Sequence, residues 1–464
     1  MLINQTPDAY DKLQVLGGMA MDDVLGRPDV RDATRVPYPA GGRRSPLPGV
    51  YKAAMPSGKS ISLFRVMFTD FCKMDCYYCP NSHWVPRKRY AFKVDELARM
   101  FIDLQRRETV NGLFLSSGIA GTASKTTEKL IKVVDLVRNK YGFKGYVHLK
   151  VMPGTDHGLV EAAHRLGSRL SVNMETPDPE LMRRLSGMKD LERDILAPMG
   201  WIDRLTRETS GGAVGQATQL VVGAAGESDA DILRRIGQLY GQWNVKRVYY
   251  SPFRPVLHTP LEDHPATPAR RGYRLYQMDW LKRVYGFSND ELETAFDDRG
   301  FLPMSEDPKT VIALNSLDSF PVDLAKASIP QLLRVPGIGP KAAERIERNR
   351  RRRRLNNWRD LQAFGVVKAS AWPFVVFPGH RPNPGRQLMM DMFGVERELE
   401  EREKQLPSKT WRAPKPTSTT SSAPCGIANS CAGCSLFGAP GHPGYNPVSW
   451  GRPAEAKPQP VSVN

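Results

Sequence analysis

Long apolar runs are missing from this sequence. No stretch of about 18 consecutive apolar residues occurs, so the sequence predicts no membrane-spanning helix. The first residues, MLINQTPDAYDKLQ, are polar and lack the apolar core of a secretory signal peptide. These absences predict a cytoplasmic protein, in a compartment where thiols stay reduced and grouped cysteines bind metal more often than they form disulfides.

Cysteine is also rare in this sequence, and acidic residues are fewer than basic ones. The 464 residues include six cysteines, and all of them fall in two triplets, at 72–79 and 425–434. Asp and Glu number 49 against 66 Lys and Arg, which leaves a net charge of +17. This excess of positive charge favours polyanionic partners such as nucleic acids. Hydrophobic residues make up 41% of the chain, which is enough for a globular body.

A chain of 464 residues is too long for one ordinary domain and predicts two domains with extensions. Residues 1–48 are interpreted as an N-terminal arm, because a helix-like stretch precedes a segment rich in Pro, Gly and Arg. Over 49–304, apolar or β-branched runs alternate with amphipathic stretches, as in parallel βα units. We therefore expect an α/β fold with a partial (β/α)6 TIM-like barrel. In such folds chemistry lies at the carboxyl ends of the strands, and the first cysteine triplet directly follows the first strand.

The first triplet has the spacing Cys-x3-Cys-x2-Cys, with Cys72, Cys76 and Cys79. A structural zinc site normally uses four ligands, typically as two separated pairs. Three close cysteines without an evident fourth ligand suit a cubane iron–sulfur cluster, in which one iron lacks a protein ligand and can bind a small molecule. A structural zinc loop and buried unpaired thiols are the alternative interpretations.

This spacing, the aromatic Tyr78 directly before Cys79, and the position after a first strand resemble the radical S-adenosylmethionine (radical SAM) superfamily. The resemblance implies a radical SAM barrel with a 4Fe–4S cluster on the three cysteines and S-adenosylmethionine on the open iron. It also implies that the reduced cluster cleaves this cofactor to methionine and a 5′-deoxyadenosyl radical. Tyr78 is accordingly a candidate cofactor-binding residue.

The resemblance implies further cofactor-binding residues at two strand ends. The superfamily often has Gly-Gly-Glu after the second strand, where this chain has Ser116, Ser117 and Gly118. Backbone contact with the methionine amine is expected there, but the missing Glu puts a side-chain role in doubt. Asn173 and Glu175, at the end of the fourth strand, alternate toward one face and are expected to reach the ribose hydroxyls.

Residues 305–385 are predicted to form a small all-α domain. Within 329–346, apolar residues on two short helices flank the turn PGIG, where Gly337 and Gly339 permit unusual backbone angles. Free N–H groups at the start of the second helix can hold an anion, and Lys341 adds charge beside them. The pattern resembles the helix-hairpin-helix motif of DNA repair proteins, which implies contact with duplex phosphates without sequence readout. A hairpin of purely structural role is the alternative.

A run of arginines follows this hairpin directly. Residues 348–354 read RNRRRRR, and although a basic run is usually a solvated surface, its place beside the hairpin favours contact with DNA. The candidate DNA-binding residues are Gly337, Gly339, Lys341, Arg350, Arg351, Arg352, Arg353 and Arg354.

The last part of the chain differs in composition from the rest. Residues 386–424 are interpreted as a charged helix and a flexible Pro/Ser/Thr linker, and 425–464 as a Cys-rich tail. The tail holds the second triplet, Cys425, Cys431 and Cys434. Three interpretations stay open: a second iron–sulfur cluster, a zinc site completed by His442, or a tail with no fixed metal.

The combination of barrel and hairpin resembles the DNA modification or repair radical SAM proteins, a family associated with a uracil-DNA glycosylase-like partner. This resemblance covers about residues 10–385. It implies an enzyme whose 5′-deoxyadenosyl radical acts on a nucleotide in double-stranded or damaged DNA, with an electron donor such as flavodoxin or ferredoxin. The alternatives are an RNA-modifying radical SAM enzyme, a nucleic-acid-binding protein with a redox-sensing cluster, and a radical enzyme that acts on a peptide or small molecule. No catalytic side chain is assigned.

Overall fold

A computed structural model describes residues 7–25, 47–54, 60–209, 214–351, 355 and 357–380. The chain divides into two compact units, of which the first ends at Ile312 and the second begins at Ala313. Among the described residues, none of the helices has the length and apolar content needed to cross a bilayer.

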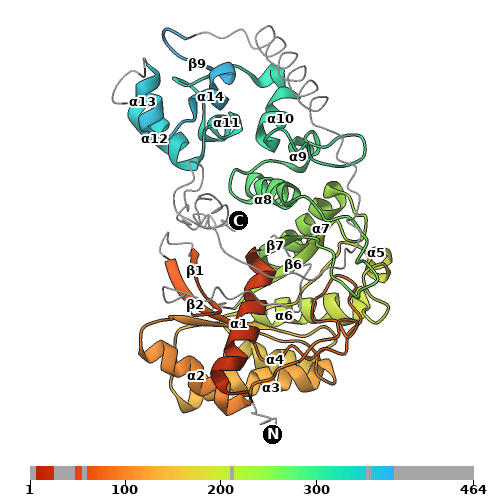
Figure 1. The fold of residues 1–464 in the computed structure, drawn as a ribbon. Helices are drawn as coiled ribbons and strands as arrows, with labels where there is room; N and C mark the ends of the chain where they lie inside the picture. Colours follow the sequence, from red (N-terminus) through yellow and green to blue (C-terminus); the bar gives the residue numbers. More distant parts are fainter. Residues whose placement is uncertain are drawn as a thin grey trace, which may run out of the picture. The chain divides into compact units, whose positions relative to one another are not determined.

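The first unit is built on a seven-stranded sheet whose strands lie side by side in the order of the sequence (Figure 1). Strand β1 (Val50–Ala54) runs antiparallel to β2 (Ser60–Met67). The sheet continues in parallel through β3 (Gly112–Ser116), β4 (Tyr146–Lys150), β5 (Arg169–Ser171), β6 (Gly215–Val222) and β7 (Val245–Pro252). These six parallel strands form the curled half-barrel that the alternating sequence pattern predicts, and the antiparallel β1 is an addition that the pattern did not indicate.

Helices link the parallel strands and cover one face of the sheet (Figure 1). They are α2 (Val94–Arg106), α3 (Ala123–Asp135), α4 (His157–Leu166), α5 (Pro179–Arg183), α6 (Ala197–Glu208) and α7 (Asp229–Gln242). Alternate strand residues pack against them, as Leu113 and Leu115 of β3 and Val147 and Leu149 of β4 show, all with no exposed surface. The main hydrophobic core therefore lies between the sheet and its helices.

Helix α1 (Ala9–Leu25) belongs to the same core, although its residues fall in the predicted N-terminal arm. Leu13 and Leu16 are buried, and the Lys12 ammonium pairs with the carboxylate of Glu96 at 2.8 Å. After β7, helices α8 (Ala269–Arg283) and α9 (Asn289–Glu293) complete this unit, and α10 (Pro308–Leu314) spans the boundary.

The described residues of the second unit include four short helices in two hairpins. They are α11 (Ile329–Arg334), α12 (Pro340–Arg350), α13 (Trp358–Ala363) and α14 (Lys368–Ala371). Leu332, Leu361 and Ile346 are buried between them. The unit differs from the all-α prediction, because β8 (Val322–Asp323) and β9 (Val375–Val376) form a short parallel pair.

Candidate cofactor site at the cysteine loop

The cysteine loop, residues 70–90, begins where β2 ends, at the carboxyl edge of the sheet. Tight turns fold it around the triplet, because the Cys79 N–H donates to the Cys76 carbonyl at 3.2 Å and the Ser82 N–H donates to the Cys79 carbonyl at 3.0 Å. Cys76 is buried, whereas Cys72 and Cys79 are partly exposed. The loop thus presents two thiols toward accessible space and one toward the protein interior.

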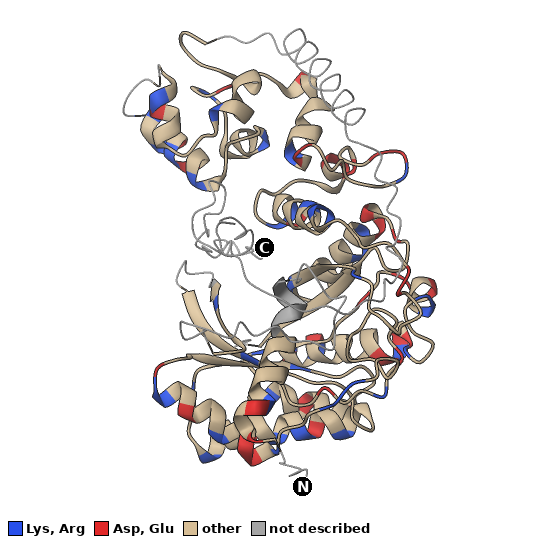
Figure 2. Cartoon of the chain, in the orientation of Figure 1, with Lys and Arg blue, Asp and Glu red and all other residues tan. Residues whose placement is uncertain are grey.

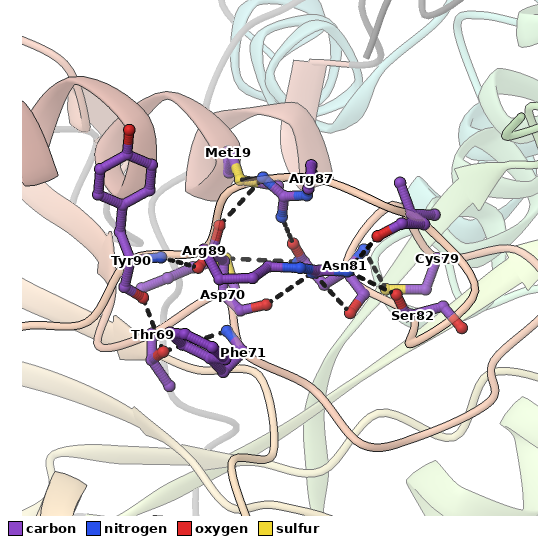
Figure 3. Close-up of polar contacts among 12 residues, drawn as sticks. Met19, Thr69, Asp70, Phe71, Cys79, Asn81, Ser82, Arg87, Arg89 and Tyr90 are labelled. Atoms are coloured by element: carbon purple, nitrogen blue, oxygen red, sulfur yellow. Dashed lines mark hydrogen bonds and ion pairs between the residues drawn. The ribbon is translucent and has the colours of Figure 1, made fainter. Parts of the chain in front are cut away.

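Two arginines hold the loop in shape (Figure 3). The Arg89 guanidinium donates to four carbonyls, those of Asp70, Asn81, Ser82 and Val85, at 2.7–3.0 Å. Arg87 forms an ion pair with the Asp70 carboxylate at 3.0 Å. Burial raises the pKa of Asp70, while the Tyr90 N–H and the Arg87 charge oppose that rise. Because a lysine offers no planar fork of donors, the arginines suit these positions for geometric reasons.

Arg87 and the backbone also fix the segment next to Cys79 (Figure 3). Arg87 donates to the side-chain oxygen of Asn81 at 2.5 Å, and the Asn81 N–H donates to the Cys79 sulfur at 3.4 Å. A backbone N–H that points at a cysteine sulfur stabilises the thiolate form, which is the form that binds metal.

The loop after β3 packs directly on the cysteine loop. The Gly118 N–H donates to the Thr69 carbonyl at 2.7 Å, and the Lys73 N–H donates to the Ile119 carbonyl at 2.9 Å. A Cβ at Gly118 would lie 2.5 Å from the Phe71 carbonyl oxygen and 3.2 Å from the Cys72 Cβ, so only glycine fits there. The predicted cofactor-binding residues Ser116 and Ser117 precede this contact, with Ser116 buried at the strand end.

The segment after β5 supplies a buried carboxylate. Glu175 has a positive φ of 67°, and its backbone pairs with Gln219 and Val221 of β6. Its Oε1 accepts a hydrogen bond from the Lys189 ammonium at 3.3 Å, and its buried Oε2 has no hydrogen-bond partner. The predicted neighbour Asn173 is also buried at this edge.

Lys189 links this carboxylate to the cysteine loop, a role that the sequence analysis missed. Its ammonium donates to the Tyr78 hydroxyl at 3.0 Å and also interacts with the Cys76 thiol. Burial lowers the pKa of Lys189, but the negative charges of Cys76 and Glu175 outweigh burial and raise it. Burial also raises the pKa of Tyr78 well above its ordinary value, so its hydroxyl keeps its proton.

Asp75 anchors the segment that carries Lys189. Its buried carboxylate accepts a hydrogen bond from the Ser186 hydroxyl and another from the Gly187 N–H, the latter at 2.7 Å. The Tyr77 N–H adds a bond to the Leu185 carbonyl at 2.9 Å. No sequence motif signals these residues, since they meet across more than 100 positions in the chain.

The described part of the chain has no group of three or more His, Cys, Asp or Glu side chains placed to hold one metal ion. In a cubane cluster each cysteine binds a different iron atom, so the sulfurs need not converge on one point.

The candidate DNA-binding residues lie in the second unit. Gly337 has a φ of +76°, and a Cβ there would lie 2.6 Å from the Val367 carbonyl oxygen. Gly339 is the N-cap of α12, with Pro340 at its first position and the half-exposed Lys341 next. Because α12 begins at these residues, its amino end coincides with the glycine turn.

The structure describes two of the five candidate arginines. Arg350 is partly buried and donates to the carbonyls of Leu324 and Ala327 at 3.3 and 2.5 Å. Arg351 is exposed and pairs with Glu347 at 3.1 Å. Arg352, Arg353 and Arg354 lie outside the described residues, as do Cys425, Cys431 and Cys434.

Comparison with known proteins gives one family match, within the first unit. Residues 66–233 match the family model described as the radical SAM superfamily. This range runs from β2 into α7 and contains the cysteine loop and the segments after β3 and β5.

Individual relatives are distant. The GTP 3′,8-cyclase of Nitrobacter winogradskyi is 26% identical over 153 residues, which cover 31% of this chain and 42% of the relative. The FeFe-hydrogenase maturase HydG from Carboxydothermus hydrogenoformans is 12% identical, with 45% of this chain and 48% of that chain covered and a TM-score of 0.37. For methylornithine synthase (PylB) the identity is 16%, the coverage 58% and 66%, and the TM-score 0.35.

The chain spans less than half the length of the curated relative that it matches. The family model falls on the part of the chain that contains the cysteine loop. Residues 66–233 are therefore similar to the radical SAM superfamily, whose members are enzymes that use a 4Fe–4S cluster and S-adenosylmethionine.

Proposed function

We propose that the chain is a radical SAM enzyme that acts on a nucleotide in DNA. The observation that carries this proposal is the presence, in one chain, of a radical SAM domain and a separate unit with a glycine turn between two helices. The first supplies radical chemistry, and the second offers the amino end of a basic helix to a polyanion.

The residues of the cysteine loop fit the cluster and its cofactor. Cys72, Cys76 and Cys79 would hold three irons, and Tyr78 and Lys189 lie against them. The buried Oε2 of Glu175 is an acceptor without a hydrogen-bond partner among the described residues, which suits a ribose hydroxyl of S-adenosylmethionine. The segment 116–118 would approach the methionine part through its backbone, because Gly118 allows close packing on the cysteine loop.

When bound and reduced, the cluster would supply cleavage of S-adenosylmethionine to methionine and a 5′-deoxyadenosyl radical, which abstracts hydrogen from the substrate. The residues of this chain would hold the cluster and the cofactor in position. Arg89 fixes the loop through its four carbonyl contacts, and Lys189 places a positive charge beside Cys76 and Glu175. That charge offsets the negative charge of thiolate ligands in a buried setting.

The second unit supports DNA as the target. Helix α12 carries Lys341, Arg345, Arg348 and Arg350 with only two acidic residues, as the blue bands along it show (Figure 2). Phosphate contacts of this kind fix position on a duplex without reading its sequence. A base within a duplex would have to be flipped out, at a cost of a few kcal/mol, unless it is damaged or unpaired.

The test is anaerobic reconstitution of the full chain with iron and sulfide, followed by reduction in the presence of S-adenosylmethionine. Release of 5′-deoxyadenosine would be measured with normal duplex DNA, damaged duplex DNA, tRNA and no nucleic acid. We expect the largest release with one of the DNA samples. Stimulation by tRNA alone would show an RNA-modifying enzyme. No cleavage by the reduced, cluster-loaded protein would favour a redox-sensing binding protein.

A further inference from the structure

The seven strands of the first unit contain no Asp or Glu. Their basic residues are Lys52, Arg65, Lys150, Arg169, Lys246 and Arg247 (Figure 2). The strands of this curled sheet therefore carry positive charge that no acidic residue of the same strands balances. Burying such charge is costly, so the arrangement needs a physical explanation.

Strand alternation places three of these cations on the face opposite the covering helices. Arg65 lies between Phe64 and Val66, which pack in the helix-side core, so its side chain points the other way. Lys150 likewise follows the core residue Leu149, and Arg169 precedes Leu170. We call Arg65, Lys150 and Arg169 the inner basic residues.

Contacts join the inner basic residues to an aromatic pair. The Arg65 guanidinium lies over the Phe114 ring, 4.4 Å from its centroid, and Phe114 stacks on His148 with centroids 4.0 Å apart and ring planes within 11°. The strand register sets Arg169 directly beside His148 and Lys150 beside Ser171. The four adjacent strands β2, β3, β4 and β5 therefore contribute side chains to one continuous surface.

The electrostatics of this surface favour an anion. Burial lowers the pKa of His148 well below 6.5, and the charged groups that lower it further are all cations: Arg169, Arg65 and Lys150. Burial raises the pKa of Tyr146 to about 12, with Arg169 opposing, so this hydroxyl remains a donor at neutral pH. Arg65, Lys150 and Arg169 are thus cations beside a neutral His148 ring, and Tyr146 is a hydrogen-bond donor.

Arg169 has spare donor capacity. Its Nε is buried and has no hydrogen-bond partner, although a buried N–H normally has one. The guanidinium lies over the backbone of Gly215, where a Cβ would come within 3.3 Å of Nε. Because Gly215 has no side chain, space remains for the Arg169 guanidinium above this strand. An oxyanion would satisfy Nε and balance the charge, since a guanidinium matches phosphate geometry.

We propose that the inner face of the sheet binds a phosphate group of the substrate through Arg65, Lys150 and Arg169. Lys150 ends β4 at the carboxyl edge, one residue after Leu149, which pairs with Leu115 of β3. Arg169 pairs with His148, which precedes Lys150 by two residues, so Arg169 lies deeper in the barrel than Lys150. A phosphate held there would place the attached sugar and base toward the cluster side. This inference rests on the proposed function, in which the substrate is a nucleotide.

The test measures binding of thymidine 5′-monophosphate and thymidine to the full chain by calorimetry, without cofactor or turnover. A pyrimidine is chosen because it does not imitate the adenosine of S-adenosylmethionine. We expect the monophosphate to bind about tenfold more tightly than the nucleoside, since charge-assisted hydrogen bonds are of that strength. Arg169→Gln should remove this preference, and Arg169→Lys should retain part of it.

Arg165→Gln is the matched control, because Arg165 is exposed on α4 and pairs with Glu161. This variant should keep the wild-type preference. Equal binding of nucleotide and nucleoside by the wild type, or a preference unchanged in Arg169→Gln, would overturn the inference. If both Arg169 variants lost the preference for the monophosphate and also had a lowered melting temperature, the inference would be overturned. Arg169 would then stabilise the fold and not bind phosphate.

Two further measurements are needed. One distinguishes a phosphodiester of DNA from a free mononucleotide as the ligand, and the other distinguishes failure of this inference from failure of the DNA proposal. A single-stranded oligonucleotide that competes with the monophosphate places a phosphodiester at this surface, whereas competition by free nucleotides alone places a mononucleotide there. Monophosphate preference that depends on Arg169 without DNA-stimulated cofactor cleavage would uphold this inference and reject the DNA proposal. DNA-stimulated cleavage without the preference would do the reverse.

Discussion

Lys189 joins three side chains of the candidate cofactor site. One ammonium reaches Tyr78, Glu175 and Cys76, which come from two segments far apart in the sequence. A buried amine with three such partners can satisfy all of its N–H groups at once. Removing it would leave the Glu175 carboxylate buried without its counter-charge, which is costly in a low-dielectric interior.

Protonation of His148 should make the first unit sensitive to acid. Its pKa is far below 6.5 in the folded protein, so the unfolded chain binds the proton first as the pH falls. Stability is therefore full above about pH 6.5 and is lost toward lower pH, by up to about 1.4 kcal/mol per pH unit. His148→Gln should flatten this profile between pH 7 and 5, measured by urea unfolding. An equally steep profile in the variant would contradict the assignment.

Spacing alone could predict the three cysteines, because they lie within one loop and their grouping does not depend on tertiary structure. Gly118 and Glu175 could be placed at the right edge because parallel strands end together. Lys189 and Asp75 could not be predicted, since the contacts of Lys189 with Tyr78 and of Asp75 with Ser186 each span 111 positions in the chain. Nothing in the local sequence distinguishes this buried lysine from a solvated one.

At the scale of elements, the site is a junction of three loops that follow β2, β3 and β5. Each loop bonds to another through its backbone, so the site's geometry depends on the sheet's register. The strand pattern was readable from alternation, but the short β1 and the packing of α1 on β2 were not. Both depend on tertiary contacts that a run of five residues or one helix does not reveal.

Gly118→Ala tests the contact between two of these loops. The new Cβ would meet the Phe71 carbonyl oxygen at 2.5 Å, so the cysteine loop must shift. We expect reduced cluster loading, measured as iron and sulfide per chain after reconstitution. Gly158→Ala is the control, since a Cβ there has nothing within 4 Å. Equal loading of the two variants would show that the loop tolerates the shift.

Helix α12 and its following arginines should act as phosphate contacts. Arg351→Gln removes an exposed charge, so DNA binding should weaken about equally for all sequences, and the salt slope should fall by about one unit. The measurement is fluorescence anisotropy on two unrelated duplexes at several salt concentrations.

Arg350→Gln provides an informative contrast, because Arg350 bonds to the carbonyls of Leu324 and Ala327. Its loss should lower the melting temperature of the second unit, whereas Arg351→Gln should not. An unchanged salt slope in Arg351→Gln would remove this residue from the interface.

At the scale of the whole molecule, the chain has two units that are each internally packed. This division predicts that cofactor chemistry and DNA binding can be separated by mutation. Cys76→Ala should abolish cleavage of S-adenosylmethionine, because one iron loses its ligand, while leaving DNA affinity nearly unchanged. Cofactor cleavage and anisotropy would be measured on the same preparation. A matching fall in DNA affinity would mean that the two functions are not separable.

The strand order of the sheet has a consequence for synthesis on the ribosome. Helices α1 and α2 meet early, since the Lys12–Glu96 pair joins positions only 84 residues apart. Each later strand pairs with the strand made just before it, so the sheet can grow in one direction as the chain emerges. Within this seven-stranded sheet no strand has to wait for a partner that is still untranslated, apart from β1, whose partner β2 follows almost at once.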